Sequence, residues 1–218
     1  MREEPMETII PKAIDDYCAA HTTPPSALLA ELETWTRAQV KHPQMLTGHL
    51  EGALLAWLVR LTGTRRAIEI GTYTGYSALA MAAALPADGE LVTCDNDPER
   101  ARIAQSYFDR SPHGRKINLK LGPALETIAS LPAHATFDFV FLDADKENYV
   151  NYYEVILPRL KAGGLFVADN VLWSGKVLAP RKKTDKAIAA FNDRVRNDAR
   201  VECLMLPVRD GVLLVRKN

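Results

Sequence analysis

The stretch AIEIGTYTGYSALAMAAAL, residues 67–85, decides the predicted fold. Its first part, Ala67–Ile70, is a short apolar run that predicts a strand, and its last part, Tyr76–Leu85, predicts a helix. Gly71 and Gly75 mark the turn between them. Open α/β sheets receive an adenosine cofactor at such a turn, because glycine lets the backbone approach the ligand and the helix N-terminus offers free N–H groups.

This turn departs from the dinucleotide fingerprint G-x-G-x-x-G, since Tyr73 stands where the middle glycine could lie. A pyrophosphate needs that close approach of the backbone, whereas a cofactor without phosphates does not. Glu69 places a carboxylate near the strand end, which favours a cationic ligand. Asp95 ends the next predicted strand, 24 residues after Gly71, where an acid can accept hydrogen bonds from both ribose hydroxyls. We favour a cofactor site over a plain turn with a surface aspartate.

Further apolar runs alternate with helical stretches after this turn. The other predicted strands are Leu91–Asp95, Ile117–Leu121, Phe137–Asp143 and Leu165–Asp169. The helices between them are Pro98–Arg110, Ala124–Leu131 and Tyr149–Leu160, the last closed by Gly163-Gly164. Five strands with helical crossovers imply a parallel sheet that is covered on both faces.

The end of the chain follows a different pattern. After a predicted helix at Thr184–Asn197, the runs Val201–Pro207 and Val212–Arg216 flank an Asp-Gly turn. Asp-Gly between apolar runs predicts a hairpin, so the last strand should be antiparallel to its neighbour. With the five parallel strands, this predicts a seven-stranded, mostly parallel sheet.

The beginning of the chain reads as helical over residues 6–62, with the clearest helices at Ser26–Lys41 and Thr47–Leu61. We therefore predict one domain over residues 1–218. It consists of a helical cap at 1–62 and a Rossmann-like α/β core at 63–218.

Composition excludes several functional classes. Hydrophobic residues make up 47% of the 218 residues, and 27 basic residues balance 27 acidic ones. A nucleic-acid partner usually requires a basic excess, which this chain lacks. The three cysteines are unpatterned, which favours free thiols in a reducing compartment. The N-terminal residues resemble no signal peptide, and no apolar run is long enough for a membrane span. We expect a cytoplasmic protein without membrane or nucleic-acid partners.

Two almost wholly apolar runs end in acidic side chains: FVFLDADK, residues 139–146, and LFVADN, residues 165–170. Asp143, Asp169 and Asn170 would offer three oxygen ligands at one edge of the sheet, and such ligands select Mg²⁺, Mn²⁺ or Ca²⁺ over zinc. The competing interpretation is that these acids merely cap neighbouring helices and turns. Lys146 follows closely and is either a solvated lysine or a base, since a divalent charge and desolvation would both favour its neutral amine.

Four motifs together resemble the cation-dependent class I O-methyltransferases of the caffeoyl-coenzyme A and catechol type, which use S-adenosylmethionine. They are EIGTYTGYS (69–77), FLDADKENYVNYY (141–153), ADNVLWSG (168–175) and LPVRDGVLLVRK (206–217). The resemblance runs from about Lys41 to the C-terminus. It implies the Rossmann-like methyltransferase fold, a homodimer and a small phenolic acceptor.

The resemblance also implies roles for individual residues. Asp143, Asp169 and Asn170 match the ligands of the divalent cation, which we expect to be Mg²⁺, with Mn²⁺ or Ca²⁺ as alternatives. Lys146 matches the catalytic base. The matched cofactor contacts are Thr47, Glu69, Gly71, Ser77, Asp95, Ala124 and Asp145. Ser174 stands where the plant enzymes carry an asparagine that touches substrate. The resemblance therefore does not imply that the acceptor is a coenzyme A thioester.

The predicted reaction is methyl transfer from S-adenosylmethionine to one of two adjacent hydroxyls of a catechol-like molecule. Three alternatives stay open at this point. They are a nicotinamide-dependent oxidoreductase, a nucleic-acid methyltransferase and a catalytically silent module that binds S-adenosylmethionine. The missing central glycine opposes the first, the neutral charge opposes the second, and the intact set of Asp143, Lys146, Asp169 and Asn170 opposes the third.

Overall fold

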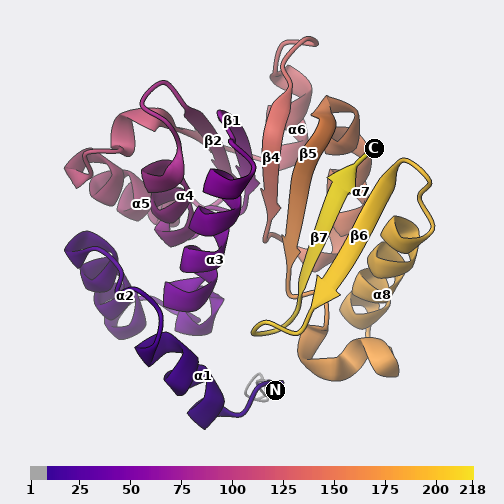
Figure 1. Ribbon diagram of the computed structural model, residues 1–218, viewed down its shortest axis with the longest axis horizontal. Coiled ribbons are helices and arrows are strands. Elements are labelled where there is room, and N and C mark those ends of the chain that lie inside the picture. The colour runs from indigo at the N-terminus through magenta and orange to yellow at the C-terminus, as the bar shows by residue number, and fades with distance from the viewer. Residues whose placement is uncertain (1–8) are drawn as a thin grey trace.

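The computed structural model describes residues 9–218, which form a seven-stranded sheet in the order β3-β2-β1-β4-β5-β7-β6 (Figure 1). The strands are β1 (Arg66–Ile70), β2 (Glu90–Asp95), β3 (Ile117–Leu121), β4 (Phe137–Leu142), β5 (Leu160–Asp169), β6 (Val201–Leu206) and β7 (Val212–Lys217). Strands β1 to β5 are mutually parallel, and β7 pairs antiparallel with both β5 and β6. The predicted parallel core and antiparallel hairpin are therefore confirmed.

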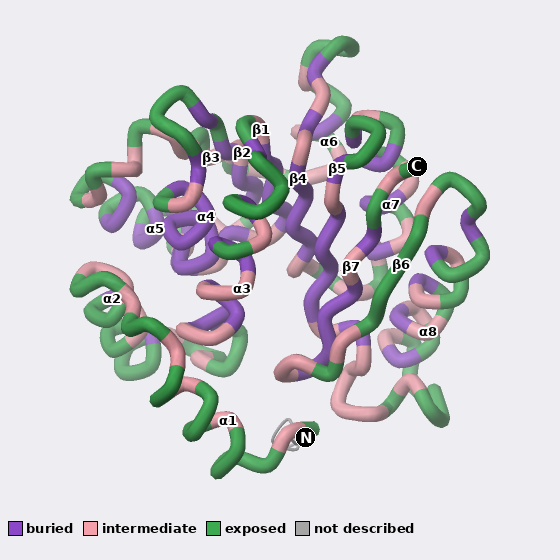
Figure 2. Tube along the Cα trace, viewed as in Figure 1, coloured by how far each residue is buried: buried purple, intermediate pink, exposed green. Residues whose placement is uncertain are grey.

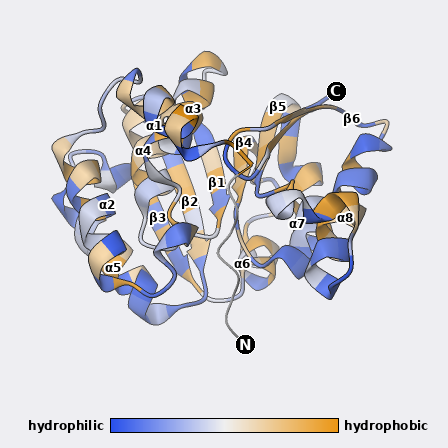
Figure 3. Ribbon diagram, turned by 90° about the horizontal axis from the view of Figure 1, so that it is seen from below, coloured by the Kyte–Doolittle hydropathy of each residue, from blue (hydrophilic) through white to orange (hydrophobic). Residues whose placement is uncertain are grey.

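Helices cover both faces of this sheet (Figure 3). One layer contains α2 (Ala27–Gln39), α3 (Gly48–Leu61), α4 (Tyr76–Ala84) and α5 (Pro98–Arg110), and the other contains α6 (Ala124–Ser130), α7 (Tyr149–Ile156) and α8 (Lys183–Arg196). The short helix α1 (Lys12–Ala20) has no buried residue and lies outside these layers. The predicted helical cap thus corresponds to α1, α2 and α3, while residues 6–8 of that prediction lie outside the described part of the chain.

The core is divided between the two faces because successive side chains of a strand point to opposite sides. On β4, Val140 and Leu142 pack toward α6 to α8, whereas Phe139 and Phe141 pack toward α2 to α5. All four are fully buried, and the central strands form the buried interior in Figure 2. Strands buried on both faces read as continuous apolar runs, which explains the pattern seen in the sequence.

The predicted boundary between the helix Tyr149–Leu160 and the strand Leu165–Asp169 is wrong. The helix expected over Tyr149–Leu160 ends at Ile156, and a 3₁₀ turn over Leu157–Arg159 leads into β5 at Leu160. Pro158 lies within this turn, where its missing N–H cannot continue a helix. The glycine pair Gly163-Gly164 is therefore part of β5 rather than a helix terminator. It lies where the register between β4 and β5 shifts.

Among residues 9–218, no helix combines the length and apolarity that crossing a bilayer requires. The longest exposed stretch of sheet is β6, whose middle four residues are all exposed.

Asp198 gives a prediction about stability. Its carboxylate, with only 4% of the side chain exposed, pairs with Arg200 at 2.6 Å and Arg194 at 2.9 Å and accepts from Tyr153 Oη at 3.1 Å. The Arg200 hydrogen bond is the main cause that holds the pKa of Asp198 well below its usual range. Because both arginines are partly exposed, we expect Asp198→Asn to lower the free energy of unfolding by about 1–3 kcal/mol at pH 7.

The sign of the pH dependence follows from the lowered pKa. The stabilisation by Asp198 is fully present above the unfolded-state pKa of about 3.9 and is lost as the pH falls through the lower folded-state pKa. Urea unfolding of the wild type and Asp198→Asn should therefore differ at pH 7 and converge in strong acid. Equal stabilities at pH 7 would contradict this assignment.

Candidate active site

The register of the parallel strands aligns the predicted site residues along one edge of the sheet. Pairing places one residue near the end of each of four neighbouring strands side by side: Cys94, Ile70, Leu142 and Ala168. The residues that follow form the next row: Asp95, Gly71, Asp143 and Asp169. Neighbouring strands lie about 4.8 Å apart. The strand order reverses between β1 and β4, and open α/β sheets bind ligands at such a switch point.

Gly71 joins the cofactor turn to the strand that carries the acids. Its backbone has a φ of +105°, and an added Cβ would lie 1.8 Å from the carbonyl oxygen of Asp143. The Gly71 N–H donates to Cys94 O at 3.0 Å, and the Asp143 N–H donates to Ile70 O at 2.9 Å. Only glycine fits this close approach, so the turn lies directly against the end of β4.

Asp95 is held in place by the backbone of the same turn. Its Oδ2 accepts from the Tyr73 N–H at 2.7 Å, and its Oδ1 accepts from the Asp97 N–H at 2.9 Å. Tyr73 has a φ of 50°, which is uncommon for a residue other than glycine and marks a constrained turn. The carboxylate is thus oriented while a second lone pair on each oxygen stays available to a ligand.

Glu69 is a fully buried carboxyl group one residue before the end of β1. Burial raises its pKa to about 8, against the opposing influence of the Ser77 and Thr93 hydroxyls. Thr93 donates to Oε2, but within residues 9–218 no hydrogen bond of normal geometry reaches Oε1. A cationic ligand beside Glu69 would favour its ionised form and supply the missing partner.

The remaining predicted cofactor residues lie around this edge. Ser77 is buried in the first turn of α4, and Ala124 begins α6. The adjoining Gly122 N–H donates to Asp95 O at 2.8 Å, which brings the Ala124 segment beside Asp95. Thr47 is buried just before α3. Asp145 accepts from Tyr152 Oη at 2.5 Å.

Asp169 and Asn170 end β5 as a compact pair of oxygen-bearing groups. Asp169 Oδ1 accepts from the Asn170 N–H at 2.6 Å, and Oδ2 accepts from Asn170 Nδ2 at 3.0 Å. Asn170 has a φ of 59°, which turns the chain sharply at the strand end. Burial and the negative charge of Asp143 raise the pKa of Asp169 to about 6.

These groups suit a hard divalent cation. Asp169 is buried, and 18% of the Asp143 side chain is exposed. Added positive charge stabilises two such neighbouring carboxylates, and their oxygens with the Asn170 amide are the donors that Mg²⁺ prefers. In the described residues, no three His, Cys, Asp or Glu side chains are arranged to hold a metal ion. The described residues therefore hold no site of the zinc type. The predicted set differs from such a site, because only two of its three ligands are acids and the third is the amide of Asn170.

Lys146 is not a solvated lysine, since only 10% of its side chain is exposed. Its Nζ donates to Asp143 Oδ1 at 2.7 Å and to Tyr149 Oη at 2.6 Å. It also lies 4.8 Å from the ring centre of Tyr149 and 5.8 Å from that of Trp173. The amine is therefore fixed beside the two acids of this edge.

Three side chains of this region had no prediction from the sequence. Tyr149 is fully buried and donates to Asp169 O at 3.0 Å, which links Lys146 to the end of β5. The buried Glu51 of α3 forms an ion pair near Asp169 with Arg209 of the β6–β7 turn, whose side chain is 27% exposed. The available sequence signals were an acid within an apolar helix and an arginine inside a predicted tight turn.

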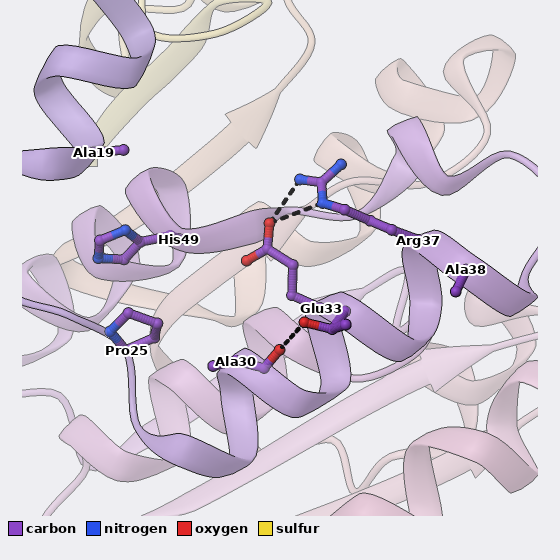
Figure 4. A pocket seen from close by; sticks show the side chains of 8 residues that line it. Ala19, Pro25, Ala30, Glu33, Arg37, Ala38 and His49 are labelled. Carbon is purple, nitrogen blue, oxygen red and sulfur yellow. Dashed lines mark hydrogen bonds and ion pairs between the residues drawn. The ribbon is translucent and has the colours of Figure 1, made fainter.

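A separate shallow cavity of about 670 Å³ lies between α1, α2 and α3 (Figure 4). It is lined by Ala19, Pro25, Ala30, Glu33, Thr34, Arg37, Ala38 and His49. Glu33 and Arg37 point toward each other and form an ion pair at 2.7 Å. None of the predicted site residues lines this cavity, so it adds nothing to the chemistry of the strand edge.

Known proteins resemble this chain over most of its length. A family model described as O-methyltransferase matches residues 19–218. Caffeoyl-CoA O-methyltransferase 2 of Zea mays is 41% identical over 191 residues, covering 81% of this chain and 72% of the relative. Catechol O-methyltransferase domain-containing protein 1 of Mus musculus is 41% identical over 194 residues, covering 87% and 74%. The crystal structure of the O-methyltransferase TomG from Streptomyces achromogenes in complex with SAM has a TM-score of 0.88 at 27% identity, covering 94% of this chain and 96% of that one.

Proposed function

We propose a substrate class and a metal requirement for this chain, which belongs to the O-methyltransferase family and is an S-adenosylmethionine-dependent O-methyltransferase. In this proposal, it methylates one hydroxyl of a vicinal-dihydroxy phenolic molecule and requires a divalent cation. The observation that carries this proposal is the burial of Lys146 against Asp143, which lies next to Asp169 and in the same row as Gly71 of the glycine turn. A base, a cation site and a donor site would then share one edge.

The cofactor turn would hold the methyl donor. Glu69 and Asp95 lie beside the turn, and both carry oxygens that a cationic nucleoside can engage. We assign Thr47, Gly71, Ser77, Ala124 and Asp145 as the surrounding contacts. The backbone of Gly71 permits close approach because it has no side chain.

Asp143, Asp169 and Asn170 would hold the cation. When bound, S-adenosylmethionine supplies an electrophilic methyl group and the divalent cation supplies positive charge that favours the ionised form of an acceptor hydroxyl. The protein then has three tasks: to orient the acceptor, to exclude water and to take up one proton.

Lys146 is our candidate for the proton acceptor. Its Nζ is held by Asp143 and Tyr149 and lies over the faces of two aromatic rings, so its position is fixed before the acceptor arrives. An ammonium group has no lone pair, and Lys146 therefore acts as a base only in its neutral form. Trp173, beside Lys146, would form one wall of the acceptor site and help to exclude water.

A panel of acceptors tests the substrate class. We expect transfer of label from S-adenosylmethionine to vicinal diphenols with Mg²⁺ present, and rates at least about tenfold lower with matched monophenols, because a single hydroxyl loses one of two anchoring oxygens. Product is measured by scintillation counting after extraction. Equal rates with monophenols and diphenols would contradict the vicinal-dihydroxy assignment.

The same assay addresses the remaining alternative of a silent module that binds S-adenosylmethionine. Binding of the cofactor without transfer to any acceptor in the panel would favour that alternative. Against it stands the buried, hydrogen-bonded state of Lys146, which a module that only binds the cofactor does not require.

We also propose a homodimer, which the resemblance implies. The α3 side chains Trp57 and Leu61 are 60% and 72% exposed, and large exposed apolar groups are suited to association. Light scattering on the purified protein measures the mass directly, and 24.2 kDa would indicate a monomer.

A further inference from the structure

Glu51 is a fully buried acid on α3, and its two carboxylate oxygens differ in their hydrogen-bond contacts. Its Oε2 accepts from Arg209 Nη1, whereas within residues 9–218 no hydrogen bond of normal geometry reaches Oε1. Only 1% of the side chain is exposed, so solvent does not replace the missing partner. An unsatisfied buried oxygen on a charged group is costly, which indicates that something else completes this site.

Arg209 fixes the orientation of this carboxylate. Its guanidinium also donates to Thr47 O and, at 3.0 Å, to Leu46 O, so it joins the β6–β7 turn to the start of α3. Arg209 has a φ of 49°, a left-handed conformation that is costly for a residue with a long side chain. The ion pair and carbonyl contacts compensate this strain, and they leave Oε1 without a contact from Arg209.

Glu51 lies beside the proposed cation site, because its ion-pair partner Arg209 comes three residues before Val212, which pairs with Asp169. Burial and the negative charges of Asp169 and Asp143 raise the pKa of Glu51 well above its usual range, and the Glu51 carboxyl lies within hydrogen-bonding reach of that of Asp169. The same two aspartates act on Arg209. Glu51 therefore shares the space at the ends of β4 and β5 with both of the carboxylates that we assign to the cation.

We propose that Glu51 is an outer carboxylate of the cation site, whose Oε1 accepts a hydrogen bond from a water molecule that the cation carries, and that Arg209 is the positioning residue that holds it there. The inference rests on the proposed cation dependence. Contact through water is favoured over direct ligation because the described acids are not arranged as a three-carboxylate ligand set, and Mg²⁺ usually keeps several waters.

Mn²⁺ binding tests this role without measuring activity. We expect Glu51→Gln to weaken Mn²⁺ binding about 10- to 100-fold, the usual cost of losing an outer-shell partner. Free Mn²⁺ is measured by electron paramagnetic resonance in a titration of the full chain. Glutamine keeps the shape and an acceptor oxygen for Arg209, so we expect circular dichroism and S-adenosylhomocysteine binding to match the wild type within about twofold.

The matched control is Glu33→Gln, which neutralises the acid of another Glu–Arg pair in the helical cap, at 2.7 Å from Arg37. Its Mn²⁺ affinity should equal that of the wild type. Unchanged Mn²⁺ affinity in folded Glu51→Gln would overturn the inference while leaving the proposed function intact. A wild type that binds no Mn²⁺ would instead overturn the cation dependence, and this inference with it.

A second measurement uses the wild type, in case Glu51→Gln does not fold. In a crystal structure with Mn²⁺, located by its anomalous scattering, we expect one water between the ion and Glu51 Oε1. An ion held by Asp143, Asp169 and Asn170 with no such water, or with Glu51 bound directly to the ion, would overturn the outer-shell role.

Discussion

Removing the divalent cation with EDTA is expected to lower methyl transfer by at least about 10³-fold while S-adenosylhomocysteine still binds. A loss of this size corresponds to about 4 kcal/mol of transition-state stabilisation, which is within the range that a bound cation provides. The two binding functions should separate because they use different residues. Glu69 and Asp95 lie on β1 and β2, whereas Asp143 and Asp169 end β4 and β5.

Asp169→Ala tests the same cation requirement by removing one of the proposed ligands. The substitution removes one of two neighbouring carboxylates whose negative charges repel each other, so we expect the fold to survive. Added Mg²⁺ should restore the EDTA-treated wild type and leave the variant inactive. Calorimetry with S-adenosylhomocysteine should give similar affinities for both proteins. Full turnover in the presence of excess chelator would show that the cation is not required.

Much of the fold could be predicted because the signals are local. The apolar runs, the glycine turn and the Asp-Gly hairpin each lie within about ten residues of sequence, and each reappears as an element or turn of the structure. The end of α7 was missed for a reason that is also local. Pro158 ends the helix before the glycine pair is reached, because it has no N–H with which to continue the helical hydrogen bonds.

The row of site residues could also be predicted, because parallel strands deliver their carboxyl ends to the same edge. The contacts that hold the row could not. Glu51 and Arg209 are 158 residues apart, and Lys146 reaches Asp169 only through Tyr149. No spacing in the sequence links these residues, since their meeting depends on how α3 and the β6–β7 turn pack against the sheet.

Replacing Lys146 by methionine is expected to lower kcat by about 10²- to 10⁴-fold, the usual contribution of a positioned proton acceptor. Methionine preserves much of the apolar length of the side chain, which contacts the rings of Tyr149 and Trp173. The affinity for S-adenosylhomocysteine should stay within about twofold. Mn²⁺ should bind at least as tightly as to the wild type, because the variant removes a positive charge 2.7 Å from Asp143.

Lys161→Met is the matched control for this experiment. Lys161 also forms a lysine–aspartate pair, with Asp138 at 2.6 Å, but it lies near the opposite ends of β4 and β5 and is 48% exposed. Its kcat should equal that of the wild type. A Lys146→Met protein that keeps more than about a tenth of the wild-type kcat would contradict the role of Lys146 as proton acceptor. The acidic edge would then have to act on the acceptor hydroxyl without a protein base.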